Sequence, residues 1–263
     1  MASDRSIMLL FINNLKIRLV LLAIIPGLIS PGCVAINPNE SRALVVAAAS
    51  DLAKIAAPLA EAFERAHGSG VAFSFGASGQ LEQQIRQGAP FDLYAPAALS
   101  YCESLQRDGF LAGECKVYAL GRLVVWSGNL AIRSLAELEG AGTLRIALAN
   151  PRYAPYGRAA QQALEAAGLW ENLRGRIVYA DSVAHAFQMA ETGNADAALV
   201  ARSLVRDEGG NVLDVDPTLH QPIEQTVAVL RSSSNQEAAR IFADFLLSPE
   251  ARGILEAYGF VDP

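Results

Sequence analysis

The stretch VVAAASDLAKIAAPLAEAFERAHG, residues 45–68, joins two hydrophobic patterns with no loop between them. A continuous apolar run ends at Ala49 and predicts a buried strand. Beyond Ser50, apolar residues recur three and four positions apart, as they do on one face of a helix. These residues are Leu52, Ile55, Leu59, Ala62 and Phe63. The sequence therefore predicts a strand that passes directly into a helix at Ser50.

A junction this tight has a chemical consequence. It points the free N–H groups of the first helical turn, and the positive end of the helix dipole, beyond the carboxyl end of the strand. Ser50 adds a hydroxyl group, and such a cluster suits an anion. The alternative is that Ser50 is only an N-cap, since serine followed by Asp51 is good capping chemistry. The junction alone leaves both interpretations open.

Composition limits the class of protein. The chain has 263 residues, of which 52% are apolar and only 18% are charged, so a substantial core forms and a disordered chain is excluded. The formal net charge of -6 disfavours a nucleic-acid partner.

The N-terminal segment differs from the rest of the chain. A basic flank precedes an apolar run of about eleven residues, and small residues follow up to Ala35. This is a secretory signal pattern, too short to span a bilayer as a mature helix. We predict a signal peptide over residues 1–35 and export to the periplasm or cell envelope. The alternatives are a lipid anchor at Cys33 and an uncleaved membrane anchor.

Removal of that segment leaves two cysteines, Cys102 and Cys115. They form an even pair in a compartment that permits disulfides. We predict a bridge between them, and the alternative is two buried thiols.

Strand and helix signals alternate along the rest of the chain, with continuous apolar strands. This indicates an α/β fold with mainly parallel sheets flanked by helices. The alternation occurs twice, before and after residues 116–127, an apolar segment too long for one strand. We interpret it as a crossing between two lobes and residues 225–230 as the return, so that one lobe comprises residues 36–120 and 229–263 and the other residues 121–228. A double crossing predicts a hinged binding protein.

In open α/β sheets, ligands bind beyond the carboxyl ends of the strands. Two such junctions of the first lobe carry serines, Ser50 and Ser78, and two of the second lobe start helices at Pro155 and Val183. Closing the lobes would bring the serine hydroxyls and the helix N-termini to one point. No lysine or arginine starts a helix of the first lobe. Such a site suits a small oxyanion held by neutral dipoles.

At these residues the chain resembles a known family. The stretches AAASDLAKIAAPLAEAFE, FGASGQLEQQIRQGAPFDLY, ANPRYAPYGRAAQQALEAAGLW and ARGILEAYGF are similar to the periplasmic molybdate-binding protein of ABC importers, the ModA type. The resemblance covers nearly all of residues 43–260 and implies the type II periplasmic binding protein fold, a Venus-flytrap clamp for molybdate or tungstate. It implies anion contacts from the hydroxyl and amide of Ser50 and Ser78 and from the amides of Tyr156 and Val183. It further implies a membrane permease as partner, a monomeric state, and no cofactor, catalytic residue or cation ligand.

The sequence departs from the family at two positions. Family members often carry a tyrosine after the strand that matches ADAALVA, where this chain has Ala201. Tyr156, conversely, stands where a small residue is common. We expect the Tyr156 hydroxyl to replace the missing one; the alternative is that its ring packs against the opposite lobe.

Other functions fit the residues less well. A secreted phosphate-ester hydrolase is disfavoured because the serines lack a Gly-x-Ser-x-Gly turn and because His67, His185 and His220 lack metal-ligand spacing. Asp92 and Asp181 form a conceivable acid–base pair, although Asp181 is better explained as a helix cap. We therefore expect a binding protein and not an enzyme. Sulfate, phosphate and ferric iron are the rival ligands.

Overall fold

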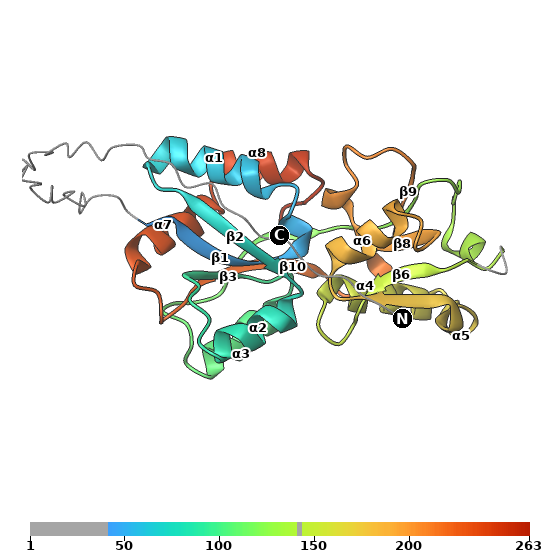
Figure 1. Cartoon of the computed structure of the whole chain (residues 1–263), viewed down its shortest axis with the longest axis horizontal. Helices are drawn as coiled ribbons and strands as arrows, with labels where there is room; N and C mark the ends of the chain where they lie inside the picture. The colour runs from blue at the N-terminus through green and yellow to red at the C-terminus, as the bar shows by residue number, and fades with distance from the viewer. Residues whose placement is uncertain (1–41, 141–143) are drawn as a thin grey trace, which may run out of the picture. The chain divides into compact units, whose positions relative to one another are not determined.

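The computed structural model describes residues 42–140 and 144–263, so the predicted signal peptide and the Cys33 lipid anchor lie outside the described residues. The described residues form two five-stranded sheets, each with helices packed on both faces (Figure 1). This is the two-lobed α/β architecture that the sequence predicts. Within the same residues, no helix has the length and hydropathy of a membrane span.

The sheet of the first lobe has the order β2-β1-β3-β10-β4. Its strands are β1 Leu44–Ala49, β2 Val71–Gly76, β3 Leu93–Ala95, β4 Lys116–Gly121 and β10 Ile223–Val229. Successive residues of β1 point to opposite faces, so Val46 and Ala48 join one core and Ala47 joins the other. The first core contains helices α1 Ala56–His67, α7 Gln236–Phe245 and α8 Pro249–Ala257, and the second contains α2 Ser78–Arg86 and α3 Leu99–Arg107.

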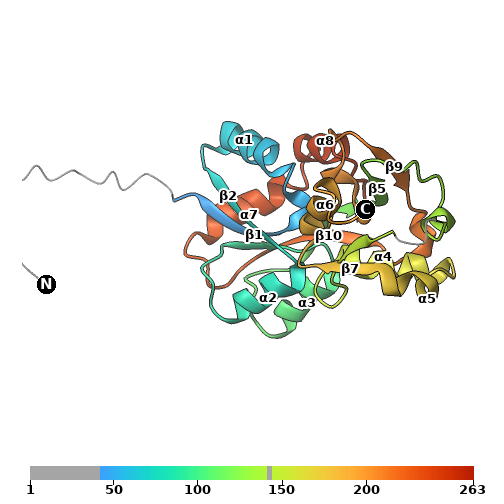
Figure 2. The same cartoon turned by 45° about the vertical axis from the view of Figure 1, so that its right-hand side comes forward.

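The sheet of the second lobe has the order β7-β6-β8-β5-β9. Its strands are β5 Leu123–Ser127, β6 Ile146–Ala149, β7 Ile177–Ala180, β8 Ala197–Ala201 and β9 Asn211–Asp214. Helices α4 Pro155–Ala166 and α6 Val183–Glu191 cover opposite faces of this sheet, and the short α5 Trp170–Leu173 follows α4 (Figure 2). Single 3-10 turns complete the described structure: η1 Ser50–Leu52, η2 Leu135–Leu138, η3 Arg174–Arg176, η4 Arg202–Leu204 and η5 Pro217–Leu219.

Each sheet is mainly parallel, as predicted: four of its five strands run in one direction, and only β10 in the first sheet and β5 in the second run against them. Strand β1 runs parallel to β2 and β3, and β6 runs parallel to β7 and β8. The pairings of β10 with β3 and β4, and of β5 with β8 and β9, are antiparallel. Strands β4, β5 and β10 flank the connections between the lobes. There the chain enters or leaves a lobe without the helical crossover that parallel neighbours require.

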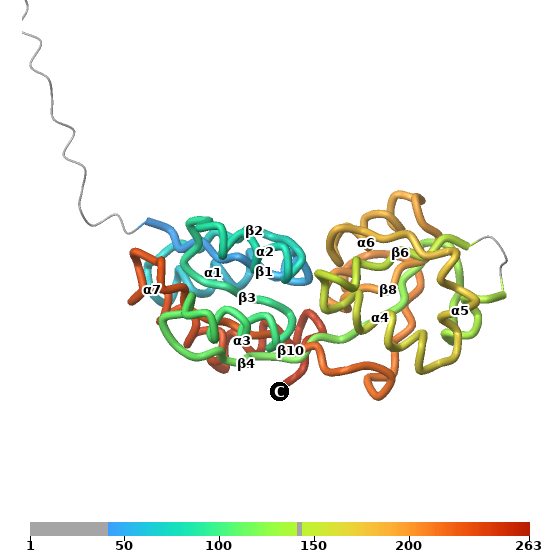
Figure 3. The backbone as a smooth tube through the Cα atoms, turned by 90° about the horizontal axis from the view of Figure 1, so that it is seen from below, coloured from blue at the N-terminus to red at the C-terminus, as the bar shows by residue number. Residues whose placement is uncertain are grey.

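The chain passes between the lobes twice, first in the green and then in the orange part of the tube in Figure 3. The first passage lies at Arg122, between β4 and β5, within the predicted crossing at residues 116–127. The second passage precedes Ile223, because β10 pairs along its length with strands of the first sheet. Residues 225–230 therefore belong to the first lobe, and the predicted boundary after residue 228 lies too late in the chain.

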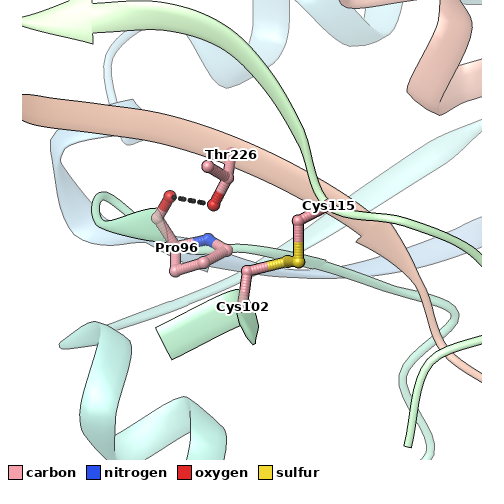
Figure 4. The surroundings of a disulfide bond; sticks show 4 residues. All are labelled: Pro96, Cys102, Cys115 and Thr226. Atoms are coloured by element: carbon pink, nitrogen blue, oxygen red, sulfur yellow. Dashed lines mark hydrogen bonds between the residues drawn. A yellow bond between two sulfur atoms is a disulfide. The ribbon is translucent and has the colours of Figure 1, made fainter. Parts of the chain in front are cut away.

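A disulfide joins Cys102 of α3 to Cys115, which directly precedes β4. Figure 4 shows it beside β10, near the point where the Thr226 hydroxyl donates a hydrogen bond to the Pro96 carbonyl oxygen. Cys102 is fully buried in the core of α2 and α3. The bond thus links a helix of the first lobe to the strand that leads into the first passage.

Candidate anion site

A small cavity lies where the two lobes meet. The first lobe contributes the ends of β1 and β2 and the start of α2, and the second lobe contributes the starts of α4 and α6. The lining residues are Ala49, Ser50, Asp51, Gly76, Ala77, Ser78, Ala97, Ala154, Pro155, Tyr156 and Val183. All four residues predicted to contact an anion are among them. The cavity has a volume of about 10 Å³, so only a small species fits.

Ser50 begins a 3-10 turn, and the α-helix that was expected there starts only at Ala56. The Ser50 N–H continues the ladder of β1 and pairs with the Gly76 carbonyl oxygen of β2, so Ser50 offers the cavity its hydroxyl. The Ser50 side chain caps no helix of its own lobe. Its Oγ instead accepts a hydrogen bond of 3.2 Å from the backbone N–H of Ala184, which lies on the second lobe. Ser50 therefore does not cap the helix that follows it, and its hydroxyl oxygen instead satisfies an N–H group in the first turn of α6.

Ser78 is the first residue of α2 and is fully buried. Its Oγ accepts a hydrogen bond of 3.1 Å from the backbone N–H of Ala97. Its carbonyl oxygen accepts one of 2.7 Å from the hydroxyl of Tyr94. These contacts fix the side chain and the start of the helix from two directions, while the hydroxyl proton of Ser78 is used by no described residue.

The second lobe presents two helix N-termini. Tyr156 is the second residue of α4, and a Cβ added to the next residue, Gly157, would lie 2.0 Å from the Ala149 carbonyl oxygen. Glycine therefore lets α4 approach β6 closely. Val183 is the first residue of α6, whose N-cap is Ser182, with Oγ accepting from the backbone N–H of His185. The prediction that Asp181 is the cap is wrong: it is an exposed neighbour of the true cap.

The backbone N–H groups of Ser78, Tyr156 and Val183, in the first turns of α2, α4 and α6, make no hydrogen bond to any described residue. With the two serine hydroxyl protons, these three N–H groups give five donors around one cavity. No lysine or arginine is among the lining residues. The arrangement is chemically suited to an anion that is stripped of water and held by neutral dipoles.

The sequence reasoning missed the role of Asp51 in the cavity wall. Its side chain is fully buried, and its Oδ2 accepts a hydrogen bond of 2.8 Å from Gln225 Nε2. Its carbonyl oxygen accepts one of 2.7 Å from the Ser203 hydroxyl of the second lobe. Burial raises the pKa of Asp51 from 3.8 to about 7, although hydrogen bonds from Tyr156, its own amide and Gln225 oppose the rise. The only signal in the sequence is that Asp51 stands two positions after the end of a buried apolar strand.

The hydroxyl of Tyr156 points toward the hinge strands. A Cβ added to Gly121 would lie 2.1 Å from the hydroxyl oxygen, and a hydrogen bond joins this hydroxyl to the Asp51 carboxyl group. Burial raises the pKa of Tyr156 well above its ordinary value. Ala201 ends β8, buried and paired with Leu123. The Tyr156 hydroxyl therefore has a partner within the protein, and whether it also serves an anion stays a prediction.

Contacts at the rims of the cavity also join the lobes. On one side, Lys54 Nζ lies 2.6 Å from Glu208 Oε1. On the other, the Tyr101 hydroxyl donates a hydrogen bond of 3.3 Å to the Arg152 carbonyl oxygen, and the Arg158 guanidinium lies 5.1 Å from the Tyr101 ring centroid. The lobes are thus also joined by contacts between residues outside the cavity wall.

Comparison with known proteins agrees with this geometry. Residues 44–261 match the family described as bacterial extracellular solute-binding protein. The molybdate-binding protein ModA of Rhodobacter capsulatus is 32% identical over 254 residues, covering 95% of this chain and 98% of that protein. The solved structure of the periplasmic molybdate-binding protein of Azotobacter vinelandii aligns with a TM-score of 0.80 and 32% identity, over 84% of this chain and 99% of that chain.

A more distant structure shares the fold alone. The sulfate-binding protein SubI of Mycobacterium tuberculosis aligns with a TM-score of 0.70 but only 17% identity, over 84% of this chain and 86% of that chain. The same two-lobed scaffold therefore occurs in proteins named for different oxyanions.

Proposed function

The chain belongs to the bacterial extracellular solute-binding protein family, in its ModA type, and from this premise we propose that it captures molybdate or tungstate between its two lobes. As a member of that family it is an extracellular or periplasmic solute-binding protein and not an enzyme. The finer statement, the identity of the anion, rests on the cavity.

One observation carries the proposal: three unused backbone N–H groups and two serine hydroxyls from both lobes surround one cavity without a cation. Each hydrogen bond to a charged acceptor contributes about 1.5–3 kcal/mol net. Five such bonds offset the cost of removing a small dianion from water and leave enough for tight binding. We assign the contacts to the hydroxyls of Ser50 and Ser78 and to the amides of Ser78, Tyr156 and Val183; the expected contact from the Ser50 amide is left out, because that N–H pairs with β2.

We infer delivery of the anion to the membrane permease of an ABC importer, which the two-lobed design suits. Lobes joined by two short connections open and close around a ligand, and a permease distinguishes the closed form from the open one. Export by the predicted signal peptide would place the protein outside the cytoplasmic membrane. The protein would act there as a monomer, with the oxyanion as ligand and no resident cofactor.

Hydrogen phosphate is the second candidate, because one feature favours it. It carries a proton that needs an acceptor, and Asp51 is one of the lining residues of the cavity. Sulfate has no such proton and differs from molybdate mainly in size. Ferric iron is disfavoured, since the cavity wall offers one tyrosine and one carboxylate that already hydrogen-bond each other.

The test is a thermal-shift panel of molybdate, tungstate, sulfate and phosphate on the exported form of the protein. A ligand at 100 times its dissociation constant adds about 2.7 kcal/mol, which raises the melting temperature by about 5–10 °C for a protein of this size. We expect this shift for molybdate and tungstate and almost none for sulfate and phosphate. An equal shift with phosphate or sulfate would overturn the assignment of the anion.

A further inference from the structure

The group behind the anion site is a buried carboxyl without a cation. Asp51 is the residue after Ser50 and contacts the second lobe and a hinge strand: Ser203 donates to its carbonyl oxygen and Gln225 donates to its Oδ2. The Tyr156 hydroxyl of α4 also reaches the carboxyl group. Asp51 therefore joins the two lobes and a strand next to the passage between them.

The groups that face Asp51 from each neighbouring element are neutral. They are Tyr156 on α4, Tyr118 on β4, Gln225 on β10 and Ser203 on η4. The nearest lysine in sequence, Lys54, is about half exposed and pairs with Glu208 instead. An ionised Asp51 would thus stand uncompensated beside a bound dianion, in a space closed to water, where like charges repel strongly.

The unused polar atoms gather at the same place. In the described part of the chain, three buried side-chain polar atoms lack a hydrogen-bond partner: Asp51 Oδ1, Gln225 Oε1 and the Tyr118 hydroxyl. Gln225 donates a hydrogen bond to Asp51, and burial, together with the negative charge of Asp51, raises the pKa of the Tyr118 hydroxyl. Two of the three atoms are acceptors only, so the cluster is short of protons. One proton on Asp51 Oδ1 would turn an unused acceptor into a donor.

We propose that Asp51 couples closure of the lobes over the anion to the uptake of one proton and so selects for a fully ionised oxyanion. The proton comes from the solvent and forms an O–H bond at Asp51 Oδ1, and no other bond changes. In the open form water reaches the carboxyl group, which is then ionised near neutral pH. In the closed form it is a neutral carboxylic acid, and the dianion meets no buried negative charge. This inference rests on the proposed function, because it concerns the same cavity.

Selectivity follows from the same step. A neutral carboxylic acid offers a proton and favours anions that only accept, such as molybdate. An ionised carboxylate would favour an anion that brings its own proton, such as hydrogen phosphate. The protonation state of Asp51 in the closed protein thus discriminates between the two candidate ligands.

The experiment is a calorimetric titration with molybdate in two buffers of different ionisation enthalpy, repeated between pH 6 and pH 9. The difference between the buffers counts the protons taken up. We expect nearly one proton at pH 6 and almost none at pH 9, with the affinity falling about tenfold across this range. The total loss of affinity over this pH range will be larger if the bound dianion raises the pKa of Asp51 further.

Two variants locate the proton. Asp51→Asn keeps the size and the acceptor for Gln225 but cannot titrate, so it should bind molybdate without proton uptake and with an affinity that varies less than twofold with pH. The control is Asp181→Asn, which removes an exposed aspartate next to α6 and should keep the wild-type pH dependence. Infrared difference spectra of the wild type should show a protonated carboxyl band on binding, absent in Asp51→Asn.

The outcomes separate the two proposals. Molybdate binding by the wild type without proton uptake overturns the role of Asp51 and leaves the proposed function intact. Uptake that persists in Asp51→Asn does the same. If molybdate does not bind at all, the proposed ligand is wrong, and the titration with whichever anion stabilises the protein decides on Asp51. If Asp51→Asn fails to fold, the proton count and infrared band of the wild type still decide.

Discussion

Asp51 and Asp92 are two aspartates of the first lobe with 0% and 1% exposure, and their partners differ in kind. Both carboxylate oxygens of Asp92 lie 2.9 Å from the Arg42 guanidinium, and Asp92 also accepts from the Val45 backbone N–H and the Ser233 hydroxyl. Asp51 has only neutral partners. A carboxylate matched by a cation and by buried donors holds the fold together. A carboxylate among neutral groups beside a cavity is free to exchange its proton when the cavity fills.

The largest effect is expected when Asp92, the aspartate paired with a cation, is removed. Asp92→Ala removes the acceptor of four hydrogen bonds and leaves the Val45 N–H and the Ser233 hydroxyl without it. We expect a loss of about 3–4 kcal/mol in the free energy of unfolding, moderated because Arg42 is more than half exposed. Urea denaturation measures it. A loss below about 1 kcal/mol, or a change in molybdate affinity of the folded protein, would contradict this role.

The next effect concerns the pH dependence of Asp51. Its pKa of about 7 in the closed protein lies above the ordinary 3.8, so the closed protein binds more protons than the unfolded chain between these values. The free energy of unfolding contributed by this group is therefore full below about pH 4 and is lost as the pH rises through 7. We expect the free energy of unfolding of the wild type, measured with molybdate present, to fall between pH 5 and pH 8 by about 2.5 kcal/mol more than that of Asp51→Asn. If the free energies of unfolding of the two proteins vary with pH in the same way, the pH dependence does not come from Asp51.

The donors around the anion come third. Ser50→Ala and Ser78→Ala should each weaken molybdate binding by about 1–3 kcal/mol, the cost of one lost charge-assisted hydrogen bond. Ser248→Ala is the matched control, since Ser248 caps α8 through a bond from the Ala251 N–H away from the cavity. It should cost about 1 kcal/mol of stability and leave affinity unchanged. Calorimetry on the three variants would exclude the assigned contacts if all bind like the wild type.

The smallest effect is expected for Tyr156→Phe. Its hydroxyl lowers the pKa of Asp51 through a hydrogen bond, so its removal should shift the pH at which affinity falls upward, while affinity at pH 6 changes less than threefold. Direct donation to the anion would instead cost about 1.5–3 kcal/mol at every pH. Affinities at several pH values distinguish the two, with the exposed Tyr179→Phe as control. A tenfold loss at pH 6 would restore the idea that Tyr156 replaces the family hydroxyl at Ala201.

The sequence was sufficient for the architecture and for the backbone of the candidate site. Continuous apolar strands and helical spacing depend on local pattern, and the four donors at Ser50, Ser78, Tyr156 and Val183 follow from where strands end and helices begin. The apolar run around residues 225–230 misled because a buried strand and a buried crossing have the same composition. Only its pairing with β3 and β4 assigns it to the first lobe.

Asp51 was out of reach for a different reason. Its partners Gln225 and Ser203 lie more than 150 positions away along the chain, so no local pattern shows that the carboxyl group is buried. An aspartate after a strand resembles an ordinary cap, and only the tertiary structure reveals the lack of a cation. Ser182 and Asp181 make the same point at short range, since the choice of cap depends on backbone angles that the letters do not give.

The Cys102–Cys115 bond has a mechanical consequence. Tyr101, which meets Arg152 and Arg158 across the rim, is the residue before Cys102, and Cys115 directly precedes the strand that runs to Arg122. The covalent bond ties that helix to that strand, so the residue at the rim and the first passage are linked through a disulfide as well as through the packing of the first lobe.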